Sequence, residues 1–350
     1  MIKKALRRIY KDKLRLLMRR LSEEYNIFGP KLVEGRIIFD RIDDVSEIIN
    51  EYHTRPVLPV KKLFLPQRET LFEYEIVDND VIISDKLDLV AKEKRCIFGV
   101  RACDIASLQI LRRFFSRGPG DPYVIGRLSN SIIIGIMCNS VFPSCFCHFT
   151  GSGPLPKDGF DLFLVDVDDY FIAIIGSERG NRIASKNEDI FLDANKDDVL
   201  AIDNKVKEIV SLMKSPPVVD QMVLYDAFVR SFNLDFWEDY AKKCLSCGKC
   251  NFNCPTCYCF DIFDEVDLDL RKGRRVRVWD SCHFLSFTRV ASGEIFRRNR
   301  SSRLKQRVYH KFVYSVNDIG LISCVGCGRC FEVCPASIDL RDIITKVLCG

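Results

Sequence analysis

The sequence has few histidines, no nucleotide-binding glycine motif and no long apolar run. Four histidines among 350 residues leave no histidine-rich metal site. Both the G-x-G-x-x-G fingerprint of dinucleotide folds and the G-x4-G-K-[ST] phosphate loop are missing. Glycine pairs at 117–121 and 150–154 are therefore interpreted as turns. Any flavin or nicotinamide chemistry is expected on another subunit.

The apolar stretches are too short to span a bilayer. Residues 131–137 and 160–176 are the most hydrophobic, and they are short or interrupted by charge, as is typical of buried strands. The first eight residues, Met-Ile-Lys-Lys-Ala-Leu-Arg-Arg, contain no signal-peptide core. We therefore expect a cytoplasmic protein without a membrane span, and its seventeen cysteines indicate a reducing, oxygen-poor environment.

Cysteine, by contrast, is abundant and occurs in two copies of one cassette, at 244–255 and 324–335. Each cassette has the pattern C-x2-C-x2-C-x3-C-P, the run that holds cubane iron–sulfur clusters. In paired cassettes the fourth cysteine ligates the other cluster. The spacing thus predicts two [4Fe–4S] clusters, one held by Cys244, Cys247, Cys250 and Cys334 and one by Cys324, Cys327, Cys330 and Cys254.

Two other interpretations of the cassettes are structural zinc sites and disulfides. Zinc sites normally take four ligands in two pairs, whereas each cassette offers three closely spaced thiols and a fourth before proline. Disulfides are disfavoured because nothing in the sequence directs the chain to an oxidising compartment. Iron–sulfur ligation is the interpretation that fits both copies.

A third group of cysteines lies in the first half of the chain. Residues 96–100 predict a short strand, followed by Cys103 and by Asp104 as a plausible helix N-cap, where helix amides and the dipole favour a thiolate. A second strand at 131–137 precedes Cys138. If the two strands are parallel neighbours, these thiols gather with Cys145 and Cys147 at the carboxyl edge of a sheet. The hypothesis is a third [4Fe–4S] cluster; the alternative is that Cys103 and Cys138 are small buried hydrophobes.

Three further thiols, Cys257, Cys259 and Cys282, lie near the first cassette in sequence. They could shield its cluster, hydrogen-bond to its sulfides or compete as alternative ligands. Shielding is the favoured interpretation, because buried sulfur and aromatic rings lower the local dielectric and so tune the reduction potential.

The chain is expected to fold as an α+β or α/β protein of two domains. Prolines at 216 and 217 place the boundary between a mixed α/β domain, 1–215, and a helix-rich ferredoxin-like dicluster domain, 220–350. Periodicity predicts helices within 1–25, 197–213, 225–240 and 286–298, and strands at 35–40, 74–77 and 81–84. Prolines make 56–66 an extended loop.

Positive charge is concentrated between Arg271 and Lys311, a stretch that contains thirteen lysines and arginines and only two acidic residues. The block could neutralise clusters, dock an acidic protein surface or bind nucleic acid. Nucleic acid is disfavoured, since no recognised DNA- or RNA-binding motif accompanies the charge.

The cassettes occur together with a specific set of other motifs. These are Phe98-Gly-Val-Arg-Ala-Cys-Asp104, Cys145-Phe-Cys147, Cys254-Pro-Thr-Cys-Tyr-Cys-Phe260, Arg277-Val-Trp-Asp-Ser-Cys282 and His310-Lys-Phe312. The combination resembles the dicluster iron–sulfur subunit of anaerobic sulfite reductase and the beta subunit of archaeal sulfhydrogenases over nearly the whole chain. Ala102 is a departure, since relatives commonly carry proline or serine there.

The resemblance implies that the chain binds [4Fe–4S] clusters. It also implies that the chain functions together with two other subunits, one that binds flavin and NAD(P) and one that carries a sulfite reductase or hydrogenase catalytic centre. The first functional hypothesis is therefore an electron-transfer subunit of an anaerobic sulfur-metabolising oxidoreductase, with no catalytic residues of its own. The alternative is a self-contained iron–sulfur or flavin reductase acting on a sulfur compound, and a third is a zinc-bearing nucleic-acid binder.

Overall fold

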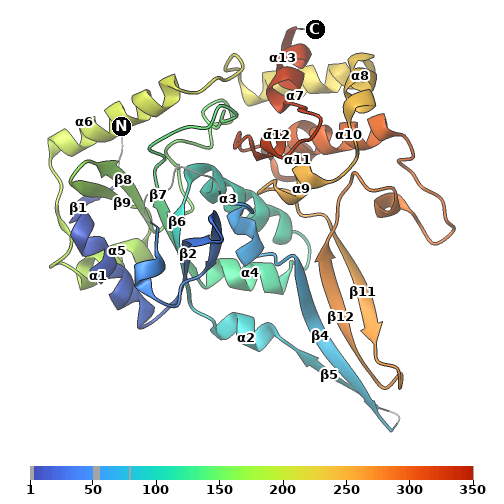
Figure 1. Ribbon diagram of the computed structural model, residues 1–350, viewed down its shortest axis with the longest axis horizontal. Coiled ribbons are helices and arrows are strands. Elements are labelled where there is room, and N and C mark those ends of the chain that lie inside the picture. The colour runs from blue at the N-terminus through green and yellow to red at the C-terminus, as the bar shows by residue number, and fades with distance from the viewer. Residues whose placement is uncertain (1–3, 50–55, 79, 350) are drawn as a thin grey trace.

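An eight-stranded mixed sheet forms the centre of the first half of the chain (Figure 1). The computed structural model describes residues 4–49, 56–78 and 80–349. The strand order is β10-β1-β9-β8-β7-β6-β2-β3, and β2, β6, β7 and β8 are parallel neighbours. The strands are β1 (Leu6–Tyr10), β2 (Asn26–Val33), β3 (Arg36–Arg41), β6 (Arg95–Val100), β7 (Ser131–Ile136), β8 (Leu162–Val167), β9 (Tyr170–Ile175) and β10 (Leu192–Asp193).

Helices cover both faces of this sheet, which is why β6 and β7 are buried along their whole length. Alternate residues of a strand point to opposite faces, so Ile97 packs into one core layer and Phe98 into the other. One layer is formed with α3 (Ala102–Phe115), α4 (Pro122–Ser129) and α6 (Lys196–Ser211); the other is formed with α1 (Lys11–Ser22) and α5 (Glu178–Lys186). A short helix, α2 (Leu87–Lys92), leads into β6.

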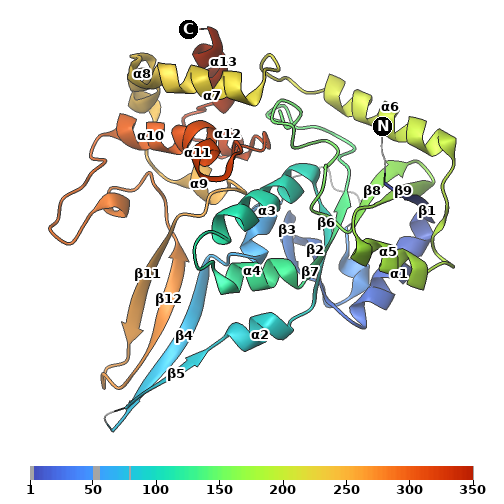
Figure 2. The same ribbon diagram turned by 180° about the vertical axis from the view of Figure 1, so that it is seen from behind.

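A second, four-stranded antiparallel sheet projects from the body as an arm (Figures 1 and 2). Its order is β11-β12-β4-β5, which joins two segments far apart in sequence. The strands are β4 (Arg68–Val77), β5 (Asp80–Asp85), β11 (Phe260–Val266) and β12 (Lys272–Trp279). Because β12 lies between β11 and β4, the second half of the chain is hydrogen-bonded directly to the first.

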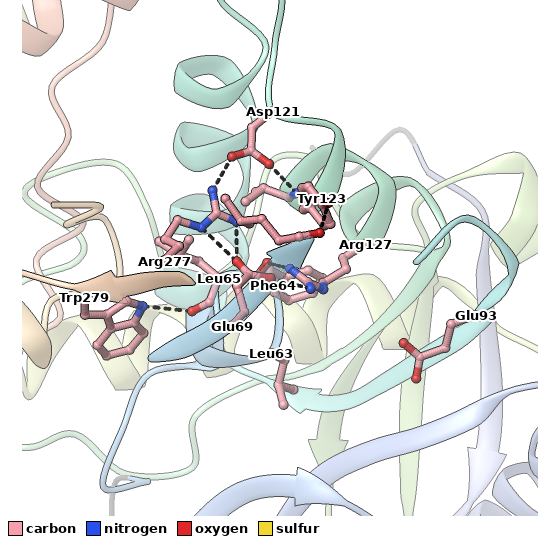
Figure 3. A network of polar contacts seen from close by, with 12 residues as sticks. Leu63, Phe64, Leu65, Glu69, Glu93, Asp121, Tyr123, Arg127, Arg277 and Trp279 are labelled. Atoms are coloured by element: carbon pink, nitrogen blue, oxygen red, sulfur yellow. Dashed lines mark hydrogen bonds and ion pairs between the residues drawn. The ribbon is translucent and has the colours of Figure 1, made fainter. Parts of the chain in front are cut away.

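A buried ionic network fixes the base of this arm (Figure 3). The guanidinium of Arg277, 2% exposed, donates to the carboxylates of Glu69 and Asp121. Arg127 donates to the other carboxylate oxygen of Glu69 at 2.6 Å. The Trp279 indole N–H donates to the carbonyl oxygen of Leu65 at 3.0 Å. Removing one partner of such a network would leave a buried charge uncompensated, so these contacts orient β12 and the segment that follows it.

The remaining helices pack around an aromatic core at the C-terminal end (Figure 1). Phe228 and Phe312 stack with their ring centroids 4.5 Å apart, and Trp237 and Tyr309 pack beside them. The helices are α7 (Gln221–Arg230), α8 (Phe236–Lys243), α9 (Lys249–Phe252), α10 (Arg300–Tyr309), α11 (Ser315–Ile319), α12 (Arg329–Glu332) and α13 (Leu340–Cys349), with a π-helical turn at His310–Tyr314.

The mixed α/β content followed by a helix-rich C-terminal region matches the expected fold class, but several local expectations were wrong. A helix was expected within 1–25, and α1 forms it at Lys11–Ser22, but Leu6–Tyr10 form the strand β1 instead. This strand pairs with β9 and β10, and its Ile9 is fully buried in the core. Residues 286–298 form a 3₁₀ turn and a loop that reverses at Gly293 (φ +85°). Residues 60–63 form a 3₁₀ turn within the expected loop 56–66.

The β-hairpin β11–β12 between the cassettes was not expected, and it makes this region less purely helical than predicted. The division at 215–220 stays a prediction; β4, on one side of it, pairs with β12 on the other.

Candidate iron–sulfur centres

A left-handed glycine starts the short helix of each cassette. Gly248 (φ +73°) precedes α9, and Gly328 (φ +72°) precedes α12. Glycine adopts this conformation without the steric cost that a side chain would add. At Gly248 a Cβ would also lie 2.9 Å from the ring of Phe284. The two short helices contact each other, so the cassettes face one another in the fold.

Thiols from both cassettes line one apolar cavity. Cys244, Cys247 and Cys250 of the first cassette share it with Cys330 and Cys334 of the second. Its other walls include Val308 and Ile343, which keep water away. The backbone N–H of Ser246 donates to the Cys244 sulfur at 3.4 Å, and that of Ile338 donates to the Cys334 sulfur at 3.4 Å. The first predicted ligand set thus faces a single cavity, although ligation itself stays a prediction.

The second predicted set lies next to the first. Burial raises the pKa of the Cys324 thiol, and Cys330, Cys327 and Cys254 lie close enough to raise it further. The hydroxyl of Thr256 lies 3.3 Å from the Cys254 sulfur. Cys330 therefore neighbours both sets, as expected for two centres that share paired cassettes.

The third predicted set lies at the carboxyl ends of two neighbouring strands. β6 and β7 are parallel and adjacent, as expected, so Cys103 and Cys138 follow strands that end at one edge. Asp104 is not the N-cap of α3, because the helix begins earlier than expected and Arg101 precedes it. Burial raises the pKa of Cys147, and Cys138 and Cys145 reinforce the shift. The four cysteines of the predicted third set therefore lie near one another in the structure.

The loop that carries Cys145 and Cys147 packs against the second cassette. The backbone N–H of Phe146 donates to the carbonyl oxygen of Gly326 at 2.8 Å. A Cβ on Gly326 would lie 2.5 Å from the Phe146 carbonyl oxygen, so only glycine allows this approach. Burial strongly raises the pKa of the Cys103 thiol, with Asp104 adding to the shift, while Cys327 lies among its neighbours. Burial thus outweighs the expected preference for thiolate, and a bound metal would have to displace the proton.

Several buried side-chain nitrogens beside these thiols have no hydrogen-bond partner among the residues that the structure describes. Both ring nitrogens of His283, a residue only 1% exposed, lack a hydrogen bond, as do the Nε atoms of Arg303 and Arg329. His283 lines the cavity of the first set, Arg303 is close to Cys244, and Arg329 is close to Cys327 and Cys103. Buried donors without acceptors are costly, and the sulfides and thiolates of an iron–sulfur cluster accept hydrogen bonds. The residues present therefore fit such a group.

Buried cationic side chains near the thiols also fit a negatively charged iron–sulfur cluster. Lys61, Arg307 and Lys311 are each no more than 6% exposed, and within the described ranges none forms an ion pair with a carboxylate. Burial alone would lower the pKa of Lys311, but the nearby thiols of Cys254 and Cys257 raise it. Burial lowers the pKa of Lys61 to about 8. Sequence reasoning included Arg307 and Lys311 only as part of the basic block 271–311 that could neutralise clusters, and it gave Lys61 no role in the site.

The three additional thiols lie in the same region. Cys282 accepts a hydrogen bond from the Asn251 amide at 3.0 Å and is hydrogen-bonded to Cys259. Cys257 is hydrogen-bonded to Cys254. The ammonium of Lys61 donates to the Cys257 carbonyl oxygen at 2.7 Å. These contacts join the three thiols to the surroundings of the cassettes, consistent with shielding.

Across the described residues, no three His, Cys, Asp or Glu side chains converge closely enough to hold a single metal ion. Five of the eight cassette cysteines instead line one cavity, which is the arrangement that a multi-iron cluster requires.

Comparison with known proteins agrees with this geometry. Residues 243–338 match the family model of the 4Fe-4S dicluster domain. The chain is 33% identical over 330 residues to sulfhydrogenase 2 subunit beta of Pyrococcus furiosus, covering 94% of each protein. The chain belongs to the sulfhydrogenase beta-subunit family. It thus contains a [4Fe–4S] dicluster domain, and the family resemblance seen in its motifs is confirmed.

A second relative of this sulfhydrogenase beta-type chain shares a shorter region. The F420-dependent formate dehydrogenase subunit beta of Methanocaldococcus jannaschii is 26% identical over 115 residues, which is 33% of this chain and 22% of that protein. Both relatives are named as subunits of larger oxidoreductases. In the part of the chain that the structure describes, no helix is long and apolar enough to cross a membrane.

Proposed function

We propose that this chain is the electron-transfer subunit of a sulfhydrogenase-type oxidoreductase complex. The observation that carries the proposal is the cavity shared by Cys244, Cys247 and Cys250 with Cys330 and Cys334, contributed by two cassettes about 80 residues apart. When bound, [4Fe–4S] clusters supply one-electron redox chemistry. The chain supplies the thiols, a dry surrounding and the donors and cations that balance their charge.

The residues between the thiol groups support an ordered series of three centres. Arg307 is buried, and both Cys250 and Cys330 lie within its electrostatic reach. Arg329 lies beside Cys327 and Cys103 and forms a buried bidentate ion pair with Asp104, with N–O distances of 2.9 and 2.7 Å. Cationic side chains therefore stand at each step from the first predicted set to the second and from the second to the third. The charge of Arg307, which has no carboxylate partner among the described residues, would stabilise an added electron at the neighbouring centres, whereas the charge of Arg329 is balanced by Asp104.

Other subunits would supply the electron donor and the final electron acceptor. The chain lacks the nucleotide motifs, so we assign flavin and NAD(P) binding to one partner and a catalytic centre of the hydrogenase or sulfite reductase type to another. The beta-subunit names of its relatives favour the same division of labour. All seventeen cysteines are free thiols, which favours a reducing cytoplasm as the location.

Iron content tests the number of centres. Three [4Fe–4S] clusters require about twelve irons per chain in anaerobically purified protein, whereas about eight would remove the Cys103, Cys138, Cys145 and Cys147 set. Colourless, iron-free protein would overturn the proposed function as a whole.

Serine variants test the ligands. Cys247→Ser and Cys327→Ser should each lose cluster absorbance and electron paramagnetic resonance signal and destabilise the second half of the chain. The exposed Cys349 is the control, since Cys349→Ser should change neither. Equal losses in all three variants would contradict the assignment.

A further inference from the structure

Resting on the proposed function, we propose that the protein surface around Cys247 is a docking site for an acidic redox protein. Among the eight cassette cysteines, all of which the structure describes, Cys247 is the one that is exposed. Electron tunnelling requires a donor and an acceptor to approach closely, so a partner reaches the first predicted centre most directly at this edge.

Two basic segments meet at this edge. The first is 242–249, which carries Lys242, Lys243 and Lys249, and the second is the loop 284–300. Together they contain seven lysines and arginines against one acidic residue, Glu294. The exposed members of the second segment are Arg289, Arg298 and Arg300. Lys242 is partly compensated by Asp239 at 3.5 Å, and the others keep the edge strongly positive.

Buried Arg303 ties the two segments together. Its guanidinium donates to the carbonyl oxygens of Arg297 and Arg298 and to the hydroxyl of Ser246, the last at 3.3 Å. Ser246 immediately precedes Cys247. The loop is also closed on itself, because the backbone N–H of Val290 donates to the carbonyl oxygen of Glu294 at 2.9 Å. The backbone that carries these charges is therefore held beside the segment of the exposed thiol.

Apolar side chains accompany the charges. Leu245 is 62% exposed, Leu285 50% and Phe296 68%. Leu285 follows Phe284, whose ring lies against Gly248 of the cassette. An apolar contact within a charged rim is typical of protein–protein interfaces, and complementary charge mainly accelerates association. The fitting partner is thus a protein with acidic groups around its own flavin or iron–sulfur centre.

Charge reversal tests the surface. The probe is reduced flavodoxin, a small acidic flavin protein, mixed with the anaerobic holoprotein at low ionic strength while cluster bleaching is followed by stopped flow. In Arg298→Glu/Arg300→Glu the rate should fall at least tenfold and lose most of its salt dependence. Reversal of two exposed lysines on α6, in Lys196→Glu/Lys207→Glu, should leave the rate unchanged.

Two further measurements separate the possible failures. Iron content and the extent of reduction by excess dithionite should be the same in all three proteins, and loss of either in the wild type would count against the proposed function instead. Equal flavodoxin rates in both double variants would overturn the docking site. So would a single-stranded oligonucleotide that binds at physiological salt and loses affinity only in Arg298→Glu/Arg300→Glu, since that result would assign the charge to nucleic acid.

Discussion

At the scale of single residues, His283 combines burial with unmet hydrogen-bonding capacity. Burial lowers its pKa to about 3, so the imidazole is neutral at physiological pH and carries one N–H. The ring lines the cavity of the first predicted set, and within the described part of the chain neither nitrogen has a hydrogen-bond partner. An N–H that donates to a cluster sulfur stabilises the extra negative charge of the reduced state.

We therefore expect His283→Leu to lower the reduction potential of the first cluster without loss of iron. A tenfold shift in the ratio of oxidised to reduced cluster corresponds to about 59 mV for one electron. A redox titration followed by electron paramagnetic resonance measures it. The control is His310→Leu, because His310 is half-buried and lies beside Tyr258 at 3.2 Å, outside this cavity. Equal shifts in both variants would mean that lost packing is the cause.

Individual cysteines could be predicted from sequence, whereas the residues that balance their charge could not. Spacing along the chain specifies the cassettes, since all the thiols of one cassette lie within eleven residues. Lys61 comes from a distant segment and reaches the carbonyl oxygen of Cys257 only after the chain has folded. No local pattern encodes such a contact. Conversely, the expected N-cap at Asp104 was wrong because α3 already begins at Ala102, which places Asp104 in the first turn, where its carboxylate binds Arg329.

At the scale of elements, the turn before α12 fits closely against the loop that carries Cys145 and Cys147. A Cβ on Gly328 would clash with the carbonyl oxygen of Ser144. Gly328→Ala should therefore cost the ~1–2 kcal/mol of a left-handed non-glycine residue plus ~1–3 kcal/mol for the clash. Gly320→Ala is matched, with the same φ of +72° and nothing within 4 Å, so it should cost the backbone strain alone. Denaturant unfolding of the two holoproteins measures the difference, and equal losses would contradict the close fit.

The ion pair between α3 and α12 is a second element-scale test. Asp104 and Arg329 have side chains no more than 5% exposed, and removing one partner of a buried pair typically costs ~3–5 kcal/mol. Asp104→Ala should lower the free energy of unfolding by an amount in that range and should weaken magnetic coupling between neighbouring reduced clusters. Asp193→Ala, which removes an exposed pair with Arg7, should have little effect. A small loss of unfolding free energy in both variants would show that thiolates or clusters balance the charge of Arg329 even without Asp104.

Strand positions in the central sheet could be predicted, because runs such as 131–136 are apolar on both faces. The four-stranded arm could not be predicted from the sequence. β12 carries arginines that resemble a charged surface stretch, and its pairing with β4 joins segments about 200 residues apart in sequence. The failed helix at 286–298 has a similar cause, since backbone hydrogen bonds within the loop and the anchoring by Arg303 replaced the helical pattern.

At the scale of the whole molecule, the basic stretch 271–311 separates into two populations. Arg277, Arg303, Arg307 and Lys311 are buried, whereas Arg289, Arg298 and Arg300 are exposed. Arg271, Lys272, Arg274 and Arg275 are also exposed, but they lie on or beside β12 of the arm, where three of them pair with carboxylates. Cluster neutralisation and protein docking therefore stay predictions for different residues: Arg307 and Lys311 lie buried near thiols, and the exposed arginines of 289–300 belong to the proposed docking edge. Sequence alone could not divide them, because burial depends on tertiary packing.

Iron removal should affect the two halves of the molecule unequally. The eight-stranded sheet has its own apolar core on both faces, but the cassette region holds Lys61, Arg307 and Lys311 without carboxylate partners among the described residues. After anaerobic chelation, hydrogen exchange should rise strongly within 244–260 and 300–340 and little within β6 and β7. Uniform exchange across the chain would contradict this division.

The exposure of Cys247 also sets an order of damage in air. Oxygen and peroxide would reach the predicted first centre at Cys247, while the other seven cassette cysteines are buried or half-buried. Brief aeration should therefore strip iron from the outermost centre first, leaving protein that is still brown yet no longer accepts electrons at its surface.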